Sequence, residues 1–137
     1  KHALTDLCSR TNKTGTIDTS TSRNFRRLVH RHFPAWLSTL VIGEIRQGIE
    51  RIRNRKDPTA AVNLENWLEG LEELYADKII PVTCEIAHRW GILNARNPVS
   101  YIDGFLAATA IEHNLTLVTR NTSDITATGV SFLNPFE

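Results

Sequence analysis

Methionine is absent from the 137 residues, and cysteine occurs only twice. Because the chain has no methionine, we expect that Lys1 is not the translated start. Cys8 and Cys84 lie far apart in the sequence and form no C-x-x-C motif. This spacing argues against a disulfide framework or a cysteine metal site, and it favours reduced thiols in the cytoplasm.

Long apolar runs and several common catalytic motifs are also missing. No run approaches the roughly 18–20 apolar residues that span a bilayer, and the first ten residues have no continuous apolar core. We therefore expect neither a membrane span nor a signal peptide. The five histidines lack zinc-site spacing, and the chain has no Walker loop, no G-x-G-x-x-G motif and no evident Ser-His-Asp arrangement.

The charges of the chain nearly cancel, but they are unevenly distributed. Residues 1–56 contain twelve Lys or Arg and four Asp or Glu, whereas residues 57–137 contain four and eleven. The basic half could contact phosphate groups. It could equally form solvated helix faces or a surface complementary to the acidic half, and composition leaves these interpretations open.

Apolar periodicity and turn signals predict alternating strands and helices in a single domain over residues 1–137. We expect a short first strand within 1–8 that ends near Asp6, further strands near 35–40, 78–82, 115–119 and 130–135, helices over 20–32, 40–55, 57–77, 83–96 and 100–113, and a polar loop over 120–129. This order is typical of βαβ units. It predicts an α/β fold: a three-layer α/β/α sandwich with a central, mostly parallel sheet.

Polar and acidic residues follow the predicted strands, at the edge where active sites of open parallel sheets form. They are Asp6, Glu44, Asp103, Asn121 and Asp124. Carboxylates crowded at one edge repel each other unless a cation neutralises them. Mg²⁺ takes oxygen ligands and keeps several waters, so two or three carboxylates suffice. The pattern therefore indicates metal-assisted hydrolysis of phosphodiesters.

Each of these residues also has a purely structural interpretation. Ser100 and Asp103 fit a capping box at the start of the 100–113 helix. Asn121 and Asp124 could be turn formers, because Asn and Asp side chains bond their own backbone. Glu44 could lie at the rim of its helix, and Asp6 could be a loop residue.

Four segments resemble the PIN-domain nucleases, and more narrowly the VapC/FitB-type toxins of toxin–antitoxin pairs. They are LSTLVIGEIRQGIERI (37–52), WLEGLEELYADKIIPV (67–82), IDGFLAATAIEHNLTLVTRN (102–121) and GVSFLNPFE (129–137). The combination of G-E-I-R-x-G-I, D-G-x-x-A-A-T-A and L-V-T-R-N at these separations is specific. In the family's first strand, Asp6 takes the place of the aspartate of D-T-N, followed here by Leu7 and Cys8.

The resemblance implies a cytoplasmic endoribonuclease that depends on Mg²⁺, for which Mn²⁺ may substitute. It implies Asp6, Glu44 and Asp103 as metal ligands, and Asn121 and Asp124 as further catalytic residues. Asn121 occupies the family's fourth acidic position, so we expect one tightly bound metal. The implied partners are an RNA substrate, an inhibiting antitoxin protein and a second copy of the chain, with no membrane.

The basic residues of the first half, with Arg26 and Arg27 as candidates, then acquire a role in binding the RNA backbone. Arg120, beside the site, could bind the scissile phosphate. A surface charge is the alternative for Arg120. Two other functions stay open: a domain whose catalytic site has decayed and which binds RNA or protein, and a PIN-type nuclease of RNA processing rather than a toxin.

Overall fold

The computed structural model describes residues 3–5 and 35–134 of the chain. The elements in this part follow the order β1 (Ala3–Thr5), β2 (Ala35–Ser38), α2 (Thr39–Asn54), α3 (Pro58–Leu74), η1 (Ala76–Lys78), β3 (Ile79–Ile80), α4 (Cys84–Arg96), α5 (Tyr101–Glu112), β4 (Thr116–Val118), α6 (Thr122–Thr126) and β5 (Phe132–Leu133). The helix expected over 20–32 lies outside the described residues.

The described strands form a five-stranded sheet in the order β3-β2-β1-β4-β5, and every neighbouring pair is parallel. Leu4 lies at its centre, opposite Trp36 on one side and Leu117 on the other. Thr5 lies opposite Val118, so β1 and β4 end at the same level. The predicted α/β fold with a parallel sheet is confirmed. The residues that follow β4 therefore begin at the carboxyl edge of the sheet.

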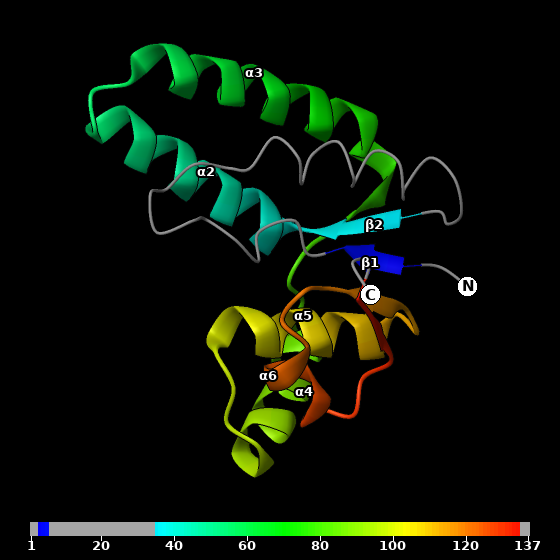
Figure 1. Cartoon of the computed structure of the whole chain (residues 1–137). Coiled ribbons are helices and arrows are strands. Elements are labelled where there is room, and N and C mark those ends of the chain that lie inside the picture. Colours follow the sequence, from blue (N-terminus) through cyan, green and yellow to red (C-terminus); the bar gives the residue numbers. More distant parts are fainter. Residues whose placement is uncertain (1–2, 6–34, 135–137) are drawn as a thin grey trace.

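Helices lie on both sides of these strands (Figure 1). The α2/α3 pair lies at one end of the view, α4, α5 and α6 lie at the other, and β1 and β2 run between them. Helix α2 follows the expected 3.6-residue pattern, with Val41, Ile45, Ile49 and Ile52 buried. No helix within residues 3–5 and 35–134 is long and apolar enough to cross a membrane.

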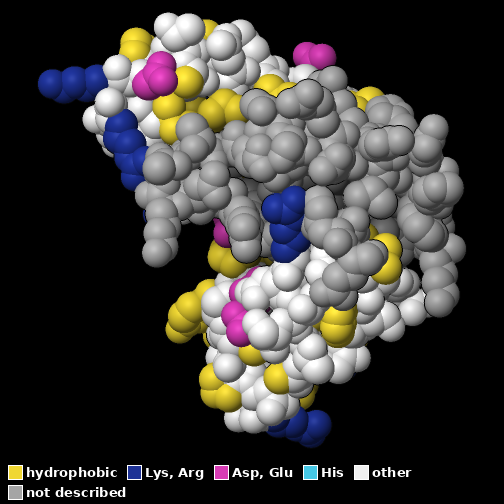
Figure 2. Space-filling view, in the orientation of Figure 1, with side chains coloured by type: hydrophobic (Ala, Val, Ile, Leu, Met, Phe, Trp, Pro, Cys, Tyr) yellow, Lys and Arg dark blue, Asp and Glu magenta, His cyan; other side chains and the backbone are white. Residues whose placement is uncertain are grey.

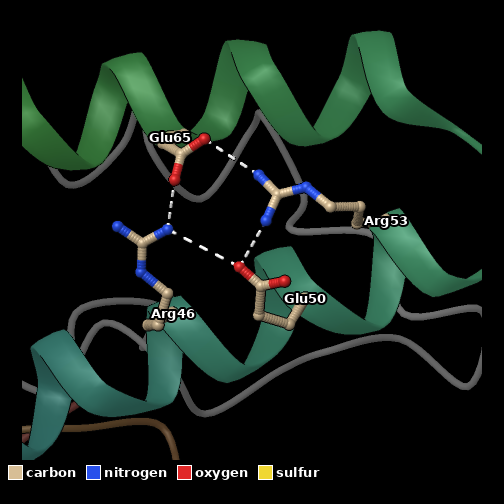
Figure 3. A network of polar contacts seen from close by, with 4 residues as sticks. All are labelled: Arg46, Glu50, Arg53 and Glu65. Carbon is tan, nitrogen blue, oxygen red and sulfur yellow. Dashed lines mark hydrogen bonds and ion pairs between the residues drawn. The ribbon is translucent and has the colours of Figure 1, made fainter.

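An ion-pair network joins α2 to α3 (Figure 3). Arg46 and Arg53 of α2 both bind the Glu65 carboxylate of α3, and Arg53 Nη1 also lies 2.5 Å from Glu50 Oε1. The hydrogen bond from Arg46, followed by the positive charges of Arg53 and Arg46, lowers the pKa of Glu65. The network fixes the two helices against each other at a partly exposed surface.

Helix α5 lies at the end of the molecule that also contains α4 and α6. Its residues Gly104, Leu106, Ala107, Ala108, Thr109 and Ala110 are all buried. Gly104 permits close contact with α4, because a Cβ there would lie 2.9 Å from Trp90 Cδ1. The Trp90 ring stacks on both Tyr101 and Phe105, with centroid distances of 5.4 and 4.8 Å. This packing fixes the first turn of α5, which carries Asp103.

Several elements differ from the expected ones: the helix expected over 57–77 ends at Leu74, and the strands expected over 78–82 and 130–135 are only Ile79–Ile80 and Phe132–Leu133. The strand expected over 35–40 ends at Ser38, because the Ser38 side chain accepts a hydrogen bond from Leu40 N and begins α2 there. The loop expected over 120–129 contains the short helix α6, whose Ile125 is fully buried against the core. A single buried isoleucine among polar residues gives too little periodicity to reveal a helix of five residues.

Candidate active site

Asp103 lies in the first turn of α5 and is held there by Ser100. The Ser100 hydroxyl accepts a hydrogen bond from Asp103 N at 3.2 Å and donates one to Asp103 Oδ2 at 2.5 Å. Ser100 is thus the N-cap that the sequence predicts. The Asp103 carboxylate, however, accepts the serine hydroxyl instead of capping in return, so only half of the expected capping box forms. The half-buried Asp103 carboxylate therefore does not serve as an acceptor for a backbone N–H at the start of the helix.

Asn121 connects Asp103 to Asp124. It follows β4 by three residues, and its backbone N–H donates to the buried Thr119 Oγ1 at 3.1 Å. Its side-chain Nδ2 donates to Asp103 Oδ2 and to Asp124 Oδ2, each at 3.0 Å. We refer to Asp103, Asn121 and Asp124 as the Asn121 cluster. It forms at the carboxyl edge of the sheet, where the sequence places all three residues.

Two serines support the cluster and were not among the candidate site residues. Besides Ser100, the Ser123 hydroxyl donates to Asn121 Oδ1 at 3.3 Å and lies 3.5 Å from Asp124 Oδ1. The S-x-x-D spacing of 100–103 pointed to Ser100 as a cap, but not to its second hydrogen bond. No sequence signal distinguishes Ser123 from an ordinary loop serine.

Two of the remaining predicted site residues, Glu44 and Arg120, lie in the described part of the chain. Glu44 lies half-buried in α2, the helix that follows β2 at the same sheet edge, and Arg120 is half-buried beside Asn121. Asp6, Arg26 and Arg27 lie outside the described residues. Their predicted roles stay predictions.

The cluster suits a hard divalent cation in the chemistry of its donors. Within the described part of the chain, no three His, Cys, Asp or Glu side chains converge on one point. Mg²⁺, however, needs only one or two carboxylates besides water and substrate oxygens. Asp103 Oδ1 accepts no hydrogen bond from the described residues, since both of its side-chain donors bind Oδ2.

Figure 2 shows how charged side chains are distributed on one face of the molecule. Acidic side chains of the lower part of the view border the notch that separates it from the α2/α3 part, and Lys or Arg side chains lie nearby.

Comparison with known proteins identifies the family. The PIN domain matches residues 17–128, a range that contains Glu44, Asp103, Asn121 and Asp124. The chain is also 30% identical over 108 residues to the VapC ribonuclease Y4jK of Sinorhizobium fredii, which covers 74% of this chain and 75% of that protein. The chain belongs to the PIN-domain family of VapC/FitB toxins.

Solved structures share the fold of this PIN domain. FitAcB from Neisseria gonorrhoeae matches with a TM-score of 0.78 and 22% identity, over 98% of this chain and 99% of that one. A toxin–antitoxin complex from Klebsiella pneumoniae matches with a TM-score of 0.63 and 23% identity, over 98% of each chain. The fold inferred from the sequence resemblance is therefore confirmed.

Proposed function

We propose that this PIN domain is a metal-dependent endoribonuclease toxin that hydrolyses RNA phosphodiester bonds and is neutralised by an antitoxin. The observation that carries the proposal is the Asn121 cluster, which joins two carboxylates at the carboxyl edge of a parallel sheet. The similarity to a VapC ribonuclease supports the reaction, and the structural match to a toxin–antitoxin complex supports the partner.

The proposed metal is Mg²⁺, with Mn²⁺ as a substitute, held by Asp103 together with Asp6 and Glu44. When bound, such an ion activates water and stabilises the charge on the leaving oxygen. The chain itself orients the Asp103 carboxylate through the Ser100 hydroxyl and the Asn121 amide. Asp124 adds a second negative charge beside it, on the exposed side of the cluster.

Substrate and partners follow from the charges and from the family. We assign Arg26, Arg27 and Arg120 to the phosphates of the RNA, which a cation binds without reading the sequence. A toxin that acts on RNA works in the cytoplasm, where its antitoxin and a second copy of the chain are the proposed protein partners.

One observation favours a second candidate function. Asn121, an amide, occupies a position where the family carries a carboxylate, and an amide brings no charge to a cation. A domain that has lost catalysis and only binds RNA would carry such a replacement. The two candidates differ in a single measurable property, which is whether the purified protein cuts RNA.

The test is cleavage of a defined RNA pool by the purified protein with Mg²⁺, with Mn²⁺ and with a chelator. Asp103→Asn should reduce cleavage by more than about 100-fold, because even the loss of a group that only supports a metal ligand costs about 10–100-fold. The fold should persist, since the Ser100 cap binds the backbone N–H of residue 103.

Asp77→Asn serves as the matched control, because Asp77 is exposed on η1 and the substitution changes the charge equally. Metal-dependent cuts that are lost only in Asp103→Asn would support the nuclease. A folded wild-type protein that binds RNA but leaves it intact in every metal would support the non-catalytic candidate.

A further inference from the structure

Tyr101 lies exposed beside the candidate active site. At 71% exposure it is the most exposed large hydrophobic side chain of the described residues, and it is the first residue of α5, next to the capping Ser100. Two residues later the same helical turn carries Asp103, at a Cα–Cα distance of about 5–6 Å in a regular helix. The two side chains leave the turn on different sides, because Asp103 binds Asn121 whereas Tyr101 contacts Trp90. The exposed ring therefore borders the turn that carries the candidate metal ligand.

Two further aromatic rings support Tyr101. Trp90 of α4 stacks on Tyr101 with an interplanar angle of 25° and on Phe105 with an angle of 5°. Packing holds the Trp90 ring, since its buried Nε1 has no hydrogen-bond partner within the described part of the chain. Gly104 leaves room for this ring, because a Cβ there would lie 3.0 Å from Trp90 Nε1. The Tyr101 ring thus rests on a fixed aromatic support although most of the residue is exposed.

Hydrogen bonds also fix the segment that leads into Tyr101. The Asn94 side chain accepts a hydrogen bond from Val99 N at 3.0 Å. Ser100 then accepts one from the backbone N–H of Asp103. A ligand that meets the Tyr101 ring therefore finds it already in place, so binding requires little ordering of the protein.

The surroundings of the ring favour a nucleobase over an apolar protein surface. Arg96, Asn97 and Ser100, on the segment before the ring, are exposed and polar. Surfaces that bind proteins are marked instead by contiguous apolar patches. A base presents a flat π-face, and every base can stack on an aromatic side chain. In Figure 2, hydrophobic side chains of the lower part lie beside the acidic ones at the notch, so both kinds of group share this part of the surface.

We propose that Tyr101 is a stacking platform for one unpaired base of the RNA substrate, in a nucleotide adjacent to the phosphate that is cut. This inference rests on the proposed function, because it assumes that RNA binds at Asp103. Tyr101 does not read the identity of the base, since stacking is tolerant of sequence. It selects instead for unpaired RNA, whose bases can be splayed out onto an aromatic ring, whereas the bases of a duplex are stacked on each other. Tyr101 is therefore a specificity-determining residue for single-stranded segments.

The first experiment measures the affinity for a short single-stranded RNA by fluorescence anisotropy, in the Asp103→Asn background so that the RNA is not cut. Tyr101→Ala should weaken binding about 5- to 100-fold, the range expected for the loss of one stacked base. Tyr101→Trp keeps an aromatic ring and should restore most of the affinity. Leu74→Ala, which truncates a 65% exposed side chain of α3, should leave the affinity unchanged. An equal loss in Leu74→Ala would overturn the inference.

Two further readouts distinguish stacking from other contacts of the ring. Tyr101→Ala should leave the slope of log affinity against log salt unchanged, because stacking releases no counterions. It should also leave the mass of the protein in solution unchanged, as measured by sedimentation. A smaller slope would mean that phosphate contacts were lost, and a smaller mass would assign the ring to contact with a second copy of the chain. Either result would overturn the inference.

RNAs with one abasic residue test the contact without changing Tyr101, and they serve even if Tyr101→Ala does not fold. When the abasic residue is moved along an RNA whose cut site is known, binding should weaken by a similar factor at one position next to the cut. In folded Tyr101→Ala the abasic residue should have no further effect at that position, since the two changes remove the same interaction. Equal effects at every position, or an effect at none, would overturn the inference.

The failures of the two proposals are distinguishable. RNA affinity that does not depend on Tyr101, in a protein that makes metal-dependent cuts, would overturn the inference and leave the nuclease standing. A folded wild-type protein that neither binds nor cuts RNA would overturn both.

Discussion

Ser100 has two roles at the start of α5. It caps α5 through Asp103 N, and it also donates its hydroxyl proton to Asp103 Oδ2. Thr83 caps α4 by accepting a hydrogen bond from Ile86 N at 3.3 Å, and its side chain also hydrogen-bonds the Glu85 carboxylate, which is not part of the Asn121 cluster. Substitutions of Ser100 and of Thr83 therefore separate two effects: the loss of a helix cap, and the loss of a hydrogen bond to the candidate metal ligand Asp103.

We predict that Ser100→Ala weakens both folding and metal binding. The lost cap should cost about 1 kcal/mol of unfolding free energy, which lowers the melting temperature by a few degrees. The lost donor should also reduce Mn²⁺ affinity by about 10–100-fold, as expected for a group that orients a metal ligand. Thermal unfolding without metal and calorimetry with Mn²⁺ measure the two effects independently.

Two control variants isolate the hydroxyl of Ser100. Thr83→Ala should cost a similar amount of stability and leave Mn²⁺ affinity unchanged. Ser100→Thr keeps a hydroxyl at the same position and should restore both properties. If Thr83→Ala weakened Mn²⁺ binding as much as Ser100→Ala, the effect would come from general loosening of the helices and not from the serine hydroxyl.

The proximity of three candidate site residues was predictable from the sequence, but their hydrogen bonds were not. Asp103, Asn121 and Asp124 could be placed together because parallel strands end at one edge and because the family motifs span them. The bridging amide could not be foreseen, since an amide takes its orientation from the acceptors that the folded chain places around it. Asp6 and Glu44 remain predicted ligands.

At the scale of elements, long helices were predictable and short ones were not. The apolar stripe of α2 and the Asp57–Pro58 start of α3 identify both helices, and Asp57 caps Ala60 N as expected. Helix α6 is too short to show a stripe. The ion pairs between α2 and α3 were also hidden, because residues 46 and 65 meet only after the two helices pack.

The ion-pair network of Figure 3 should make the stability of the α2/α3 pair depend on pH. The bound guanidinium groups lower the pKa of Glu65 in the folded chain below its unfolded value. Near pH 4 the unfolded chain thus binds more protons than the folded one. The stabilising contribution is complete above the ordinary glutamate pKa and is lost as the pH falls through the lowered value.

Glu65→Gln should therefore be less stable than the wild type at neutral pH, and the difference should shrink as the pH falls below about 4. Denaturant unfolding at several pH values measures this. Added salt should also reduce the difference, because the partly exposed charges are screened. Glu69→Gln, at an exposed position of the same helix, removes one charge outside the network. An equal loss of stability in that variant would contradict the assignment to Glu65.

At the scale of the whole molecule, the separation of charge along the chain predicts how RNA is held. The first 56 residues are strongly basic, and the residues that follow are acidic and carry the Asn121 cluster. A polyanion should therefore be bound mainly by the first part, while the second supplies the carboxylates that meet one phosphate. RNA affinity should fall with salt, because each phosphate contact releases condensed counterions.

Replacing both Arg26 and Arg27 with alanine should reduce the slope of log affinity against log salt by about 1.4, since each contact to single-stranded nucleic acid contributes about 0.7. Binding is measured in the Asp103→Asn background, so that the RNA is not cut during titration. The control combines Lys78→Ala with Arg96→Ala, which removes two exposed charges from the acidic part. A similar change of slope in both double variants would mean that the RNA senses the net charge of the protein. A change confined to the arginine pair would place the phosphate contacts at these residues.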